Sequence, residues 1–407
     1  MNRTHRIRAT LDVAVVIMIG GCGQFSGAPT GGESTADVLP SASGEVGQRS
    51  APVVGPAGNG LVAYSSDGDI FVGDPVTGKS TAVVTGPSND TRPIFSPDGL
   101  RIAFLRAESL SDGTVVVIRA DGSDEHVVAT EALTNGIPGS AWTPDSTSIL
   151  LNHDKAGTSY WDGLLSLVDA SGVAEPRLIT PPLPAQIGYT YFSIHDPMAP
   201  MFRPPNADQI VGEVEGVLSV VDIDGRHVEG FVPPSLTGFE PYSTTRLAWS
   251  RDGSMIASGQ DSGLFVMNAD GSDPRHFDAE HVDRAWSPDS SRIALEKPAT
   301  VSGSAGSVIA ILDIETGAER VLEATSAVEK PMADRATDPE AFRTDSIRTW
   351  HRYAYEGWSW TPDGRGILVL ERHGTRPMVV DIDTGLTTEL PWTSESAVSW
   401  QRVPART

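Results

Sequence analysis

Cysteine is nearly absent from this chain of 407 residues, which contains only one. A single cysteine excludes an internal disulfide framework, a thiolate metal cluster and a CxxC redox pair. Basic residues are also scarce, because 30 Lys and Arg stand against 53 Asp and Glu, for a net charge of -23. Such an acidic chain cannot neutralise phosphates over a continuous surface, which excludes nucleic acid as a partner. No apolar run reaches the roughly 18 to 20 residues that would span a bilayer.

The N-terminal residues have the pattern of an export signal. Basic residues precede a short apolar run over residues 11–21, which has the length of a signal-peptide core. The run ends in Ile19-Gly20-Gly21-Cys22, and this tetrapeptide resembles the lipobox of bacterial lipoproteins. The resemblance implies that residues 1–21 form a lipoprotein signal peptide that is removed, and that Cys22 is the site of lipid attachment. The alternative is an ordinary secretory signal in which Cys22 is incidental.

The segment at residues 22–58 contains mainly Gly, Ser, Ala, Pro and Thr. Such a segment cannot bury enough surface to offset its ordering entropy, so we predict a disordered tether. Its r.m.s. reach is on the order of 30 Å. With a lipid on Cys22, the protein is expected to be exported and anchored at the outer face of the bacterial cell membrane, or on the periplasmic side of the envelope.

From residue 59 onward the chain repeats a pentapeptide that begins with an aromatic residue. The four positions that follow the aromatic residue suit a type I β-turn. They are usually Ser or Thr, then Pro, then Asp, and then Gly or Ser. Each copy is followed by an alternating apolar run that predicts a strand, and then by a third strand that ends in a turn rich in Asp and Gly. The copies lie at residues 95–99, 142–146, 249–253, 286–290 and 360–364, with a worn copy at 202–206.

Four strands per unit, at a period of about 49 residues, predict the blades of a β-propeller. Residues 61–85 supply a second, third and fourth strand without a first one, whereas residues 397–402 carry Trp400 in the register of a first strand. We therefore predict an all-β fold, a single seven-bladed β-propeller over residues 59–403 that the C-terminal strand closes. A six-bladed ring is the alternative.

These repeats resemble those of a known family. Phe95-Ser96-Pro97-Asp98-Gly99, the strand containing Ile102-Ala103-Phe104 and the Asp-x-x-Gly turns are similar to the WD-repeat-like propeller units of the TolB family, also found in prolyl-oligopeptidase propellers. The resemblance covers most of the chain and implies the fold. TolB itself is a soluble periplasmic protein with a smaller α/β domain ahead of six blades, whereas an anchor, a tether and seven blades are predicted here. Because propellers host many unrelated activities, the resemblance implies no particular function.

The sequence offers no motif of catalytic chemistry. It has no Gly-x-Ser-x-Gly elbow, no His-Glu-x-x-His and no phosphate-binding glycine loop, and its nine histidines show no metal-ligand spacing. Turns such as Asp222-Ile223-Asp224-Gly225 lack the further ligands of a calcium loop, and their recurrence predicts structural hairpins. The recurring tryptophans predict packing between blades. We therefore expect no cofactor, no metal and no catalytic residue.

The long connections are predicted to lie on one face of the propeller. They leave a fourth strand at residues 181–200, 233–245 and 326–357, or follow a second strand at 107–113, 154–163 and 298–307. Loops on a rigid scaffold concentrate binding residues, and aromatic residues and arginine are enriched at interface hot spots. The alternative is that the aromatic side chains pin these loops to the propeller. The candidate partner-binding residues are Tyr189, Tyr191, His195 and Asp196 on the first loop, and Arg343, Arg348, Trp350, His351, Arg352 and Tyr353 on the last.

Together these features predict a lipid-anchored protein of the cell envelope that binds a protein or an envelope polymer through its loop-rich face and is not an enzyme. The alternative is a lyase or hydrolase that acts on sugar or peptide in the central channel, which clustered His and carboxylate side chains in the channel would favour. A third class is a structural member of a larger envelope assembly, which a large apolar patch on the outer blade surfaces would indicate.

Overall fold

A computed structural model divides the chain into two compact units, Met1–Arg49 and Ser50–Thr407. The residues that it describes all belong to the second unit: 55–107, 112–133, 141–153, 164–173, 177–178, 202–214, 217–223, 228–230, 246–260, 263–279, 283–301, 304–322, 357–370 and 375–404. They form β-strands joined by turns. No helix of a length and hydrophobicity that would cross a membrane occurs among these residues.

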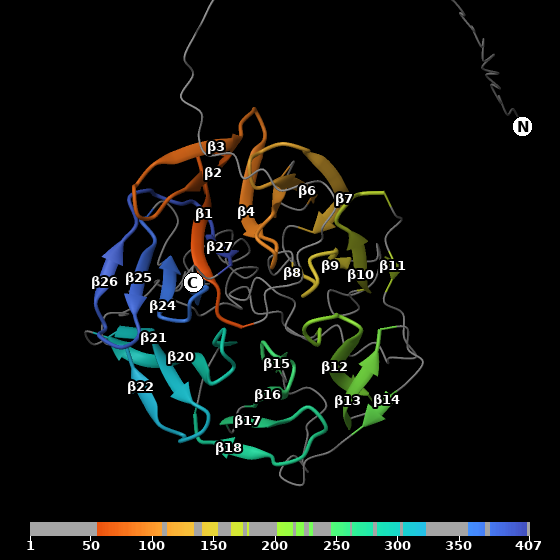
Figure 1. The fold of residues 1–407 in the computed structure, drawn as a ribbon, viewed down its shortest axis with the longest axis vertical. Helices are drawn as coiled ribbons and strands as arrows, with labels where there is room; N and C mark the ends of the chain where they lie inside the picture. Colours follow the sequence, from red (N-terminus) through yellow and green to blue (C-terminus); the bar gives the residue numbers. More distant parts are fainter. Residues whose placement is uncertain are drawn as a thin grey trace, which may run out of the picture. The chain divides into compact units, whose positions relative to one another are not determined.

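The described strands pair in seven antiparallel sheets that succeed one another along the chain (Figure 1). The first sheet has the order β27-β1-β2-β3 and contains β1 (Gly58–Ser66), β2 (Asp69–Gly73), β3 (Ser80–Val84) and β27 (Ser399–Val403). The second contains β4 (Asn89–Phe95), β5 (Arg101–Ala107), β6 (Asp112–Arg119) and β7 (His126–Leu133). The third contains β8 (Ala141–Trp142), β9 (Ser148–His153), β10 (Leu164–Asp169) and β11 (Arg177–Leu178).

The remaining four sheets follow the same order of neighbouring strands. The fourth contains β12 (Gln209–Val214), β13 (Val217–Asp222) and β14 (Val228–Gly230), and a bridge from Phe202 to Ile210 stands where the other sheets have a first strand. The fifth contains β15 (Arg246–Trp249), β16 (Met255–Gln260), β17 (Gly263–Asn268) and β18 (Arg275–Phe277). The sixth contains β19 (Asp283–Trp286), β20 (Arg292–Val301), β21 (Ser304–Asp313) and β22 (Glu319–Val321). The seventh contains β23 (Gly357–Trp360), β24 (Gly366–Leu370), β25 (Met378–Asp381) and β26 (Thr387–Glu389).

The pentapeptide forms the turn between the first and second strands, as predicted. In the copy at residues 95–99, the N–H of Gly99 donates to the carbonyl of Ser96 over 2.8 Å. The Ser96 hydroxyl donates to Oδ1 of Asp98 at 2.5 Å and accepts from the N–H of Arg101 at 3.0 Å. The last residue has a φ of 72°, a left-handed conformation that glycine adopts without steric cost. The sequence therefore satisfies the turn's polar groups within the turn itself.

The core lies between consecutive sheets, and the tryptophans of the pentapeptides lie at its centre. Trp142 and Trp286 are 0% and 2% exposed, which confirms the predicted packing for these residues. The indole N–H of each donates to a carbonyl of the preceding sheet, from Trp142 to Ile94 at 3.2 Å and from Trp286 to Ala248 at 3.3 Å. Clusters of buried apolar residues join the first sheet to the second, the second to the third, the fourth to the fifth, the fifth to the sixth, the sixth to the seventh and the seventh to the first.

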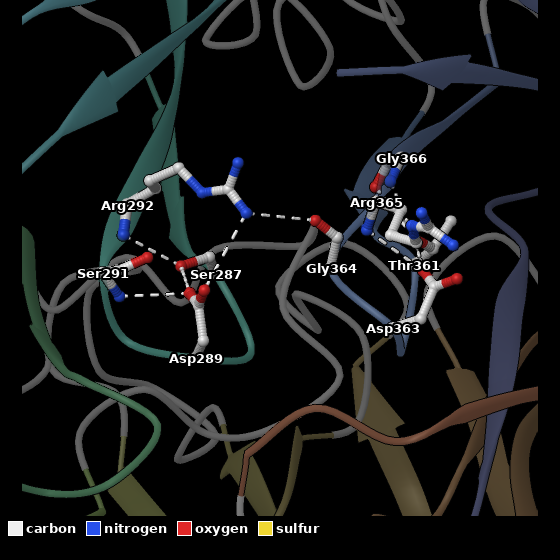
Figure 2. A network of polar contacts seen from close by, with 9 residues as sticks. All are labelled: Ser287, Asp289, Ser291, Arg292, Thr361, Asp363, Gly364, Arg365 and Gly366. Atoms are coloured by element: carbon white, nitrogen blue, oxygen red, sulfur yellow. Dashed lines mark hydrogen bonds and ion pairs between the residues drawn. The ribbon is translucent and has the colours of Figure 1, made fainter. Parts of the chain in front are cut away.

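Arginine side chains add a polar link between neighbouring sheets. Arg292, on β20, lies 5.5 Å from the ring centroid of Trp360 in the next sheet. It also donates a hydrogen bond to the carbonyl of Gly364 at 3.4 Å (Figure 2). Arg101 makes the same two contacts with Trp142 and with the carbonyl of Ser146. Each arginine thus binds both the ring and the turn of the following pentapeptide, a combination in which the cation–π contact contributes about 0.5–2 kcal/mol. Arg203 repeats this arrangement toward the fifth sheet.

The two ends of the described chain meet in the first sheet. β27 pairs with β1, with Val62 opposite Trp400 and Gly58 opposite Val403, so the C-terminal strand takes the position of a first strand in this sheet. The predicted boundary between tether and propeller, at residues 58 and 59, falls inside β1. Ala57 before it is buried and donates its N–H to the carbonyl of Pro362 at 2.9 Å.

Candidate functional site

The strand bounds give the sheets two unlike ends. We call the turn face the end that carries the connections from first to second strands and from third to fourth strands. These connections are all short, as from Phe95 to Arg101 and from Arg119 to His126. We call the loop face the other end, where second strands lead to third ones and fourth strands lead to the next sheet. The longest connections lie there, between β11 and β12, between β14 and β15, and between β22 and β23.

All the predicted site residues lie outside the described residues. Tyr189, Tyr191, His195 and Asp196 belong to the connection between β11 and β12, and Arg343, Arg348, Trp350, His351, Arg352 and Tyr353 belong to the one between β22 and β23. Cys22 also lies outside the described residues. The strand order assigns both connections to the loop face, but no contact among these side chains is described.

One of the predicted long connections is wrong as a loop. Residues 298–301 and 304–307 instead extend β20 and β21 as paired strands, with Pro298 opposite Ser307 and Val301 opposite Ser304. The β-branched residues Thr300 and Val301 favour a strand, and Ser302-Gly303 is a residue pair that suits a two-residue hairpin connection. The predicted loop at 107–113 is shorter at its ends, because Ala107 on β5 pairs with Gly113 on β6, and residues 108–111 lie outside the described residues. The predicted loop at 154–163 lies outside the described residues.

An ion pair lies near the loop-face end of the second sheet. Asp90, at the start of β4, is 2% exposed, and its carboxylate accepts two hydrogen bonds of 2.9 Å from Nε and Nη2 of Arg106. Nη1 of Arg106 reaches Glu125 at 2.8 Å. The hydrogen bond to Asp90, followed by that to Glu125, raises the pKa of the Arg106 guanidinium against the opposing effect of burial. Both oxygens of Asp90 therefore bind Arg106, and this bidentate contact joins β4 to β5.

A second buried carboxyl group lies between the sixth and seventh sheets. Glu296 on β20 is fully buried, and one of its oxygens accepts the indole N–H of Trp358 at 3.2 Å. Arg284 on β19 is 4% exposed, and it faces the fifth sheet because it pairs with Leu295 rather than with Glu296. The side chain of Glu296 thus connects β20 to β23 within an otherwise apolar cluster. This geometry indicates a link between sheets rather than a substrate contact.

The Asp-rich turns of the turn face are structural hairpins in the sheets where they are described. Thr77 donates its hydroxyl to Oδ2 of Asp74 at 2.8 Å, and this bond, followed by that from the N–H of Val76, lowers the pKa of Asp74. Asp381 accepts from Thr384 in the same way, which lowers its pKa. Each carboxylate therefore binds its own turn. No group of three or more His, Cys, Asp or Glu residues arranged to hold a metal ion occurs in the described part of the chain.

Comparisons with known proteins bear on the fold. No protein-family model and no curated protein matches the chain. TolB from Acinetobacter baumannii is 18% identical over 84% of this chain and 81% of its own, with a TM-score of 0.44. A periplasmic gluconolactonase of Pseudomonas aeruginosa is 14% identical over 84% and 99%, with a TM-score of 0.49. A prolyl endopeptidase is 10% identical over 88% of this chain and 51% of its own, with a TM-score of 0.50, so this chain spans about half of that protein.

The similarity between this chain and the prolyl endopeptidase concerns the fold alone, because the two sequences are only 10% identical. It agrees with the structure, in which consecutive antiparallel sheets pack face to face through clusters of buried residues. An array of such four-stranded sheets defines a β-propeller. The chain is therefore an all-β protein of the β-propeller class.

Proposed function

We propose that this protein is a lipid-anchored β-propeller of the bacterial cell envelope, which binds a protein or an envelope polymer through its loop face and catalyses no reaction. In this proposal the seven sheets are the blades of one ring that β27 closes, Cys22 carries the lipid, and the residues before β1 act as a tether. TolB-like repeats in the sequence are compatible with such a binding scaffold, because propellers present loops of any sequence on a constant framework.

The observation that carries the proposal is the unequal use of the two faces. On the turn face, the polar groups of the turns bind one another or the next sheet, as Asp98 binds Ser96 and Ser146. All the long connections leave from the opposite end of the strands. A face built from long, unrepeated segments is where binding residues concentrate, since it is free of the constraints that the repeated turns obey.

Binding is tested by substituting two candidate arginines on the loop face. We expect Arg343→Ala with Arg348→Ala to abolish capture of the partner from a solubilised envelope fraction, with the captured proteins identified by mass spectrometry. Arg365→Ala is the matched control, because Arg365 is exposed on the turn face and the change in charge is of the same kind. The expressed chain should start before Gly55, because Ala57 is part of the packed fold. Equal capture by the loop-face variant and the control would contradict a binding role for these arginines.

The anchor is tested independently of the partner. Cys22→Ala removes the only thiol of the chain and is expected to release the protein from the membrane fraction. Continued membrane association of this variant would show that Cys22 is not the point of attachment. Because a double-chain anchor binds stably and a single chain binds marginally, the wild-type protein should resist extraction by salt.

A further inference from the structure

The N-terminal residues join the propeller at the turn face. The carbonyl of Gly55 accepts a hydrogen bond from Arg402, and the N–H of Ala57 donates to Pro362, which lies in the turn between β23 and β24. The side-chain amide of Asn59 donates to Asp363 of the same turn at 3.0 Å, and its oxygen accepts the N–H of Asp363 at 3.1 Å. Any tether that precedes Gly55 is therefore attached to the turn face and not to the loop face.

Exposed apolar side chains of the described part of the chain gather at this same face. Val76 is 90% exposed in the connection from β2 to β3, and Leu386 is 70% exposed in the connection from β25 to β26. Val173 is 87% exposed and Leu100 is 55% exposed, and both directly follow a turn glycine. The other two large exposed hydrophobic residues, Val127 and Val321, are less exposed and lie on fourth strands. Val76 and Leu386 belong to the two sheets that also hold the N-terminal residues.

We propose that the turn face rests against the bilayer that carries the anchor, so that the loop face is presented away from the membrane. This inference rests on the lipid attachment in the proposed function. The occupant of the turn face is a lipid surface, because the tether begins there and because separate Val and Leu tips suit the shallow apolar boundary of lipid headgroups better than the packed core of a protein interface.

The charge of the turn face specifies the kind of lipid surface. Asp74 lies two residues before Val76, and Asp381 and Asp383 precede Leu386, so carboxylates lie close to these two apolar side chains in the sequence. These carboxylates are repelled by anionic headgroups over a distance comparable to the Debye length. The turn face therefore fits an uncharged lipid surface, and its contact with an anionic one is expected to weaken at low salt.

The inference is tested with the full lipoprotein, reconstituted into phosphatidylcholine vesicles that contain a nitroxide-labelled lipid. An environment-sensitive fluorophore is attached to Val76→Cys or, as the matched control, to Thr85→Cys. Thr85 is exposed and follows β3, so it marks the loop-face end of the same sheet. Because the lipid occupies Cys22, the introduced thiol is the only free one. We expect severalfold greater quenching and a blue shift for the fluorophore at residue 76, and little of either at residue 85.

The outcomes separate the two proposals. The turn-face contact is supported if quenching is stronger at residue 76 than at residue 85 and if it weakens on phosphatidylglycerol vesicles at low salt. If the protein floats with the vesicles but both positions are unquenched, or residue 85 is quenched as strongly as residue 76, the orientation is wrong and the anchor stands. If the protein does not float with the vesicles, the anchor fails and the orientation fails with it.

Discussion

The fifth position of the pentapeptide allows one contact between sheets to be measured against a matched control. This position is Gly99 in the second sheet, Gly364 in the seventh and Ser290 in the sixth, with φ angles of 72°, 71° and 60°. All three residues therefore share the left-handed conformation. What differs is the surface that the preceding sheet presents to a side chain at this position.

Gly364→Ser should be well tolerated. The nearest atom to a Cβ at Gly364 is Cδ of Pro288 at 3.5 Å, which is ordinary van der Waals contact. The hydroxyl of Ser290 accepts the N–H of Asp252 at 3.1 Å, and Asp289 is the counterpart of Asp252 in the turn that precedes Gly364. The left-handed conformation costs serine about 1–2 kcal/mol. A new hydrogen bond from Asp289 returns about 1 kcal/mol, which leaves a net loss of about 0–1 kcal/mol.

Gly99→Ser should be severe. A Cβ at Gly99 would overlap the backbone carbonyl oxygen of Arg402 on β27, and backbone cannot rotate away as a flexible side chain can. Serine at this position has the same cost for its left-handed conformation, and the overlap adds an overpacking cost of about 1–3 kcal/mol. The side-chain amide of Gln401, which donates to the carbonyl of Gly99 at 2.7 Å, is expected to lose its partner as well. The total loss is then about 2–5 kcal/mol.

Urea unfolding, followed by tryptophan fluorescence, measures the difference between the two serine variants. The expected result is that Gly99→Ser unfolds at a clearly lower urea concentration than Gly364→Ser, whose midpoint stays near that of the wild-type protein. Equal midpoints would refute the reasoning, because the backbone of β27 could not then lie against the turn that contains Gly99. That outcome would also contradict the placement of the C-terminal strand in the first sheet.

Two further predictions concern other parts of the first and sixth sheets. Gly73→Ala places a Cβ on the ring of Trp392, which must move. We therefore expect the free energy of unfolding to fall by about 1–3 kcal/mol and the tryptophan emission to shift to the red. Gly86→Ala is the control that should change neither, because a Cβ at Gly86 has nothing within 4 Å. The pKa of Asp313 is lowered from its ordinary 3.8 by hydrogen bonds from Thr316, so its contribution to stability is present above pH 4 and is lost as the pH falls through the lowered pKa. In acid titrations followed by circular dichroism, Asp313→Asn should therefore make stability fall less steeply below pH 4.

The sequence predicted the sheets well because each unit has its own local signals. The apolar runs that follow the pentapeptides form second strands as predicted, among them β9, β12 and β16. The reason is that a turn with fixed chemistry starts each run, and a short apolar run that suits a strand continues it. Likewise, Trp400 could be assigned to a first strand because the aromatic position recurs in each unit, and β27 pairs with β1 accordingly.

The features that the sequence did not predict depend on partners far away in the chain. Nothing near Arg292 or Arg203 indicates that each side chain binds the next pentapeptide, since the partner turn follows only after a whole sheet. The extension of β20 and β21 was missed because Pro298 and the small residues after it are typical of loops, although their pairing across the hairpin makes them strands. The candidate site on the loop face stays a prediction from the sequence, because its residues lie outside the described ones.

The arginine links explain why function is better sought away from the repeats. Arg101, Arg203 and Arg292 each bind the ring and a turn carbonyl of the following sheet, so a change at one of these arginines alters the packing of two sheets at once. A residue under such constraint has little freedom to be fitted to a ligand as well. The long connections of the loop face begin at the opposite end of the strands from these links. Variants of these three arginines should therefore change stability and leave partner capture intact in the folded fraction, whereas variants of Arg343 or Arg348 should do the opposite.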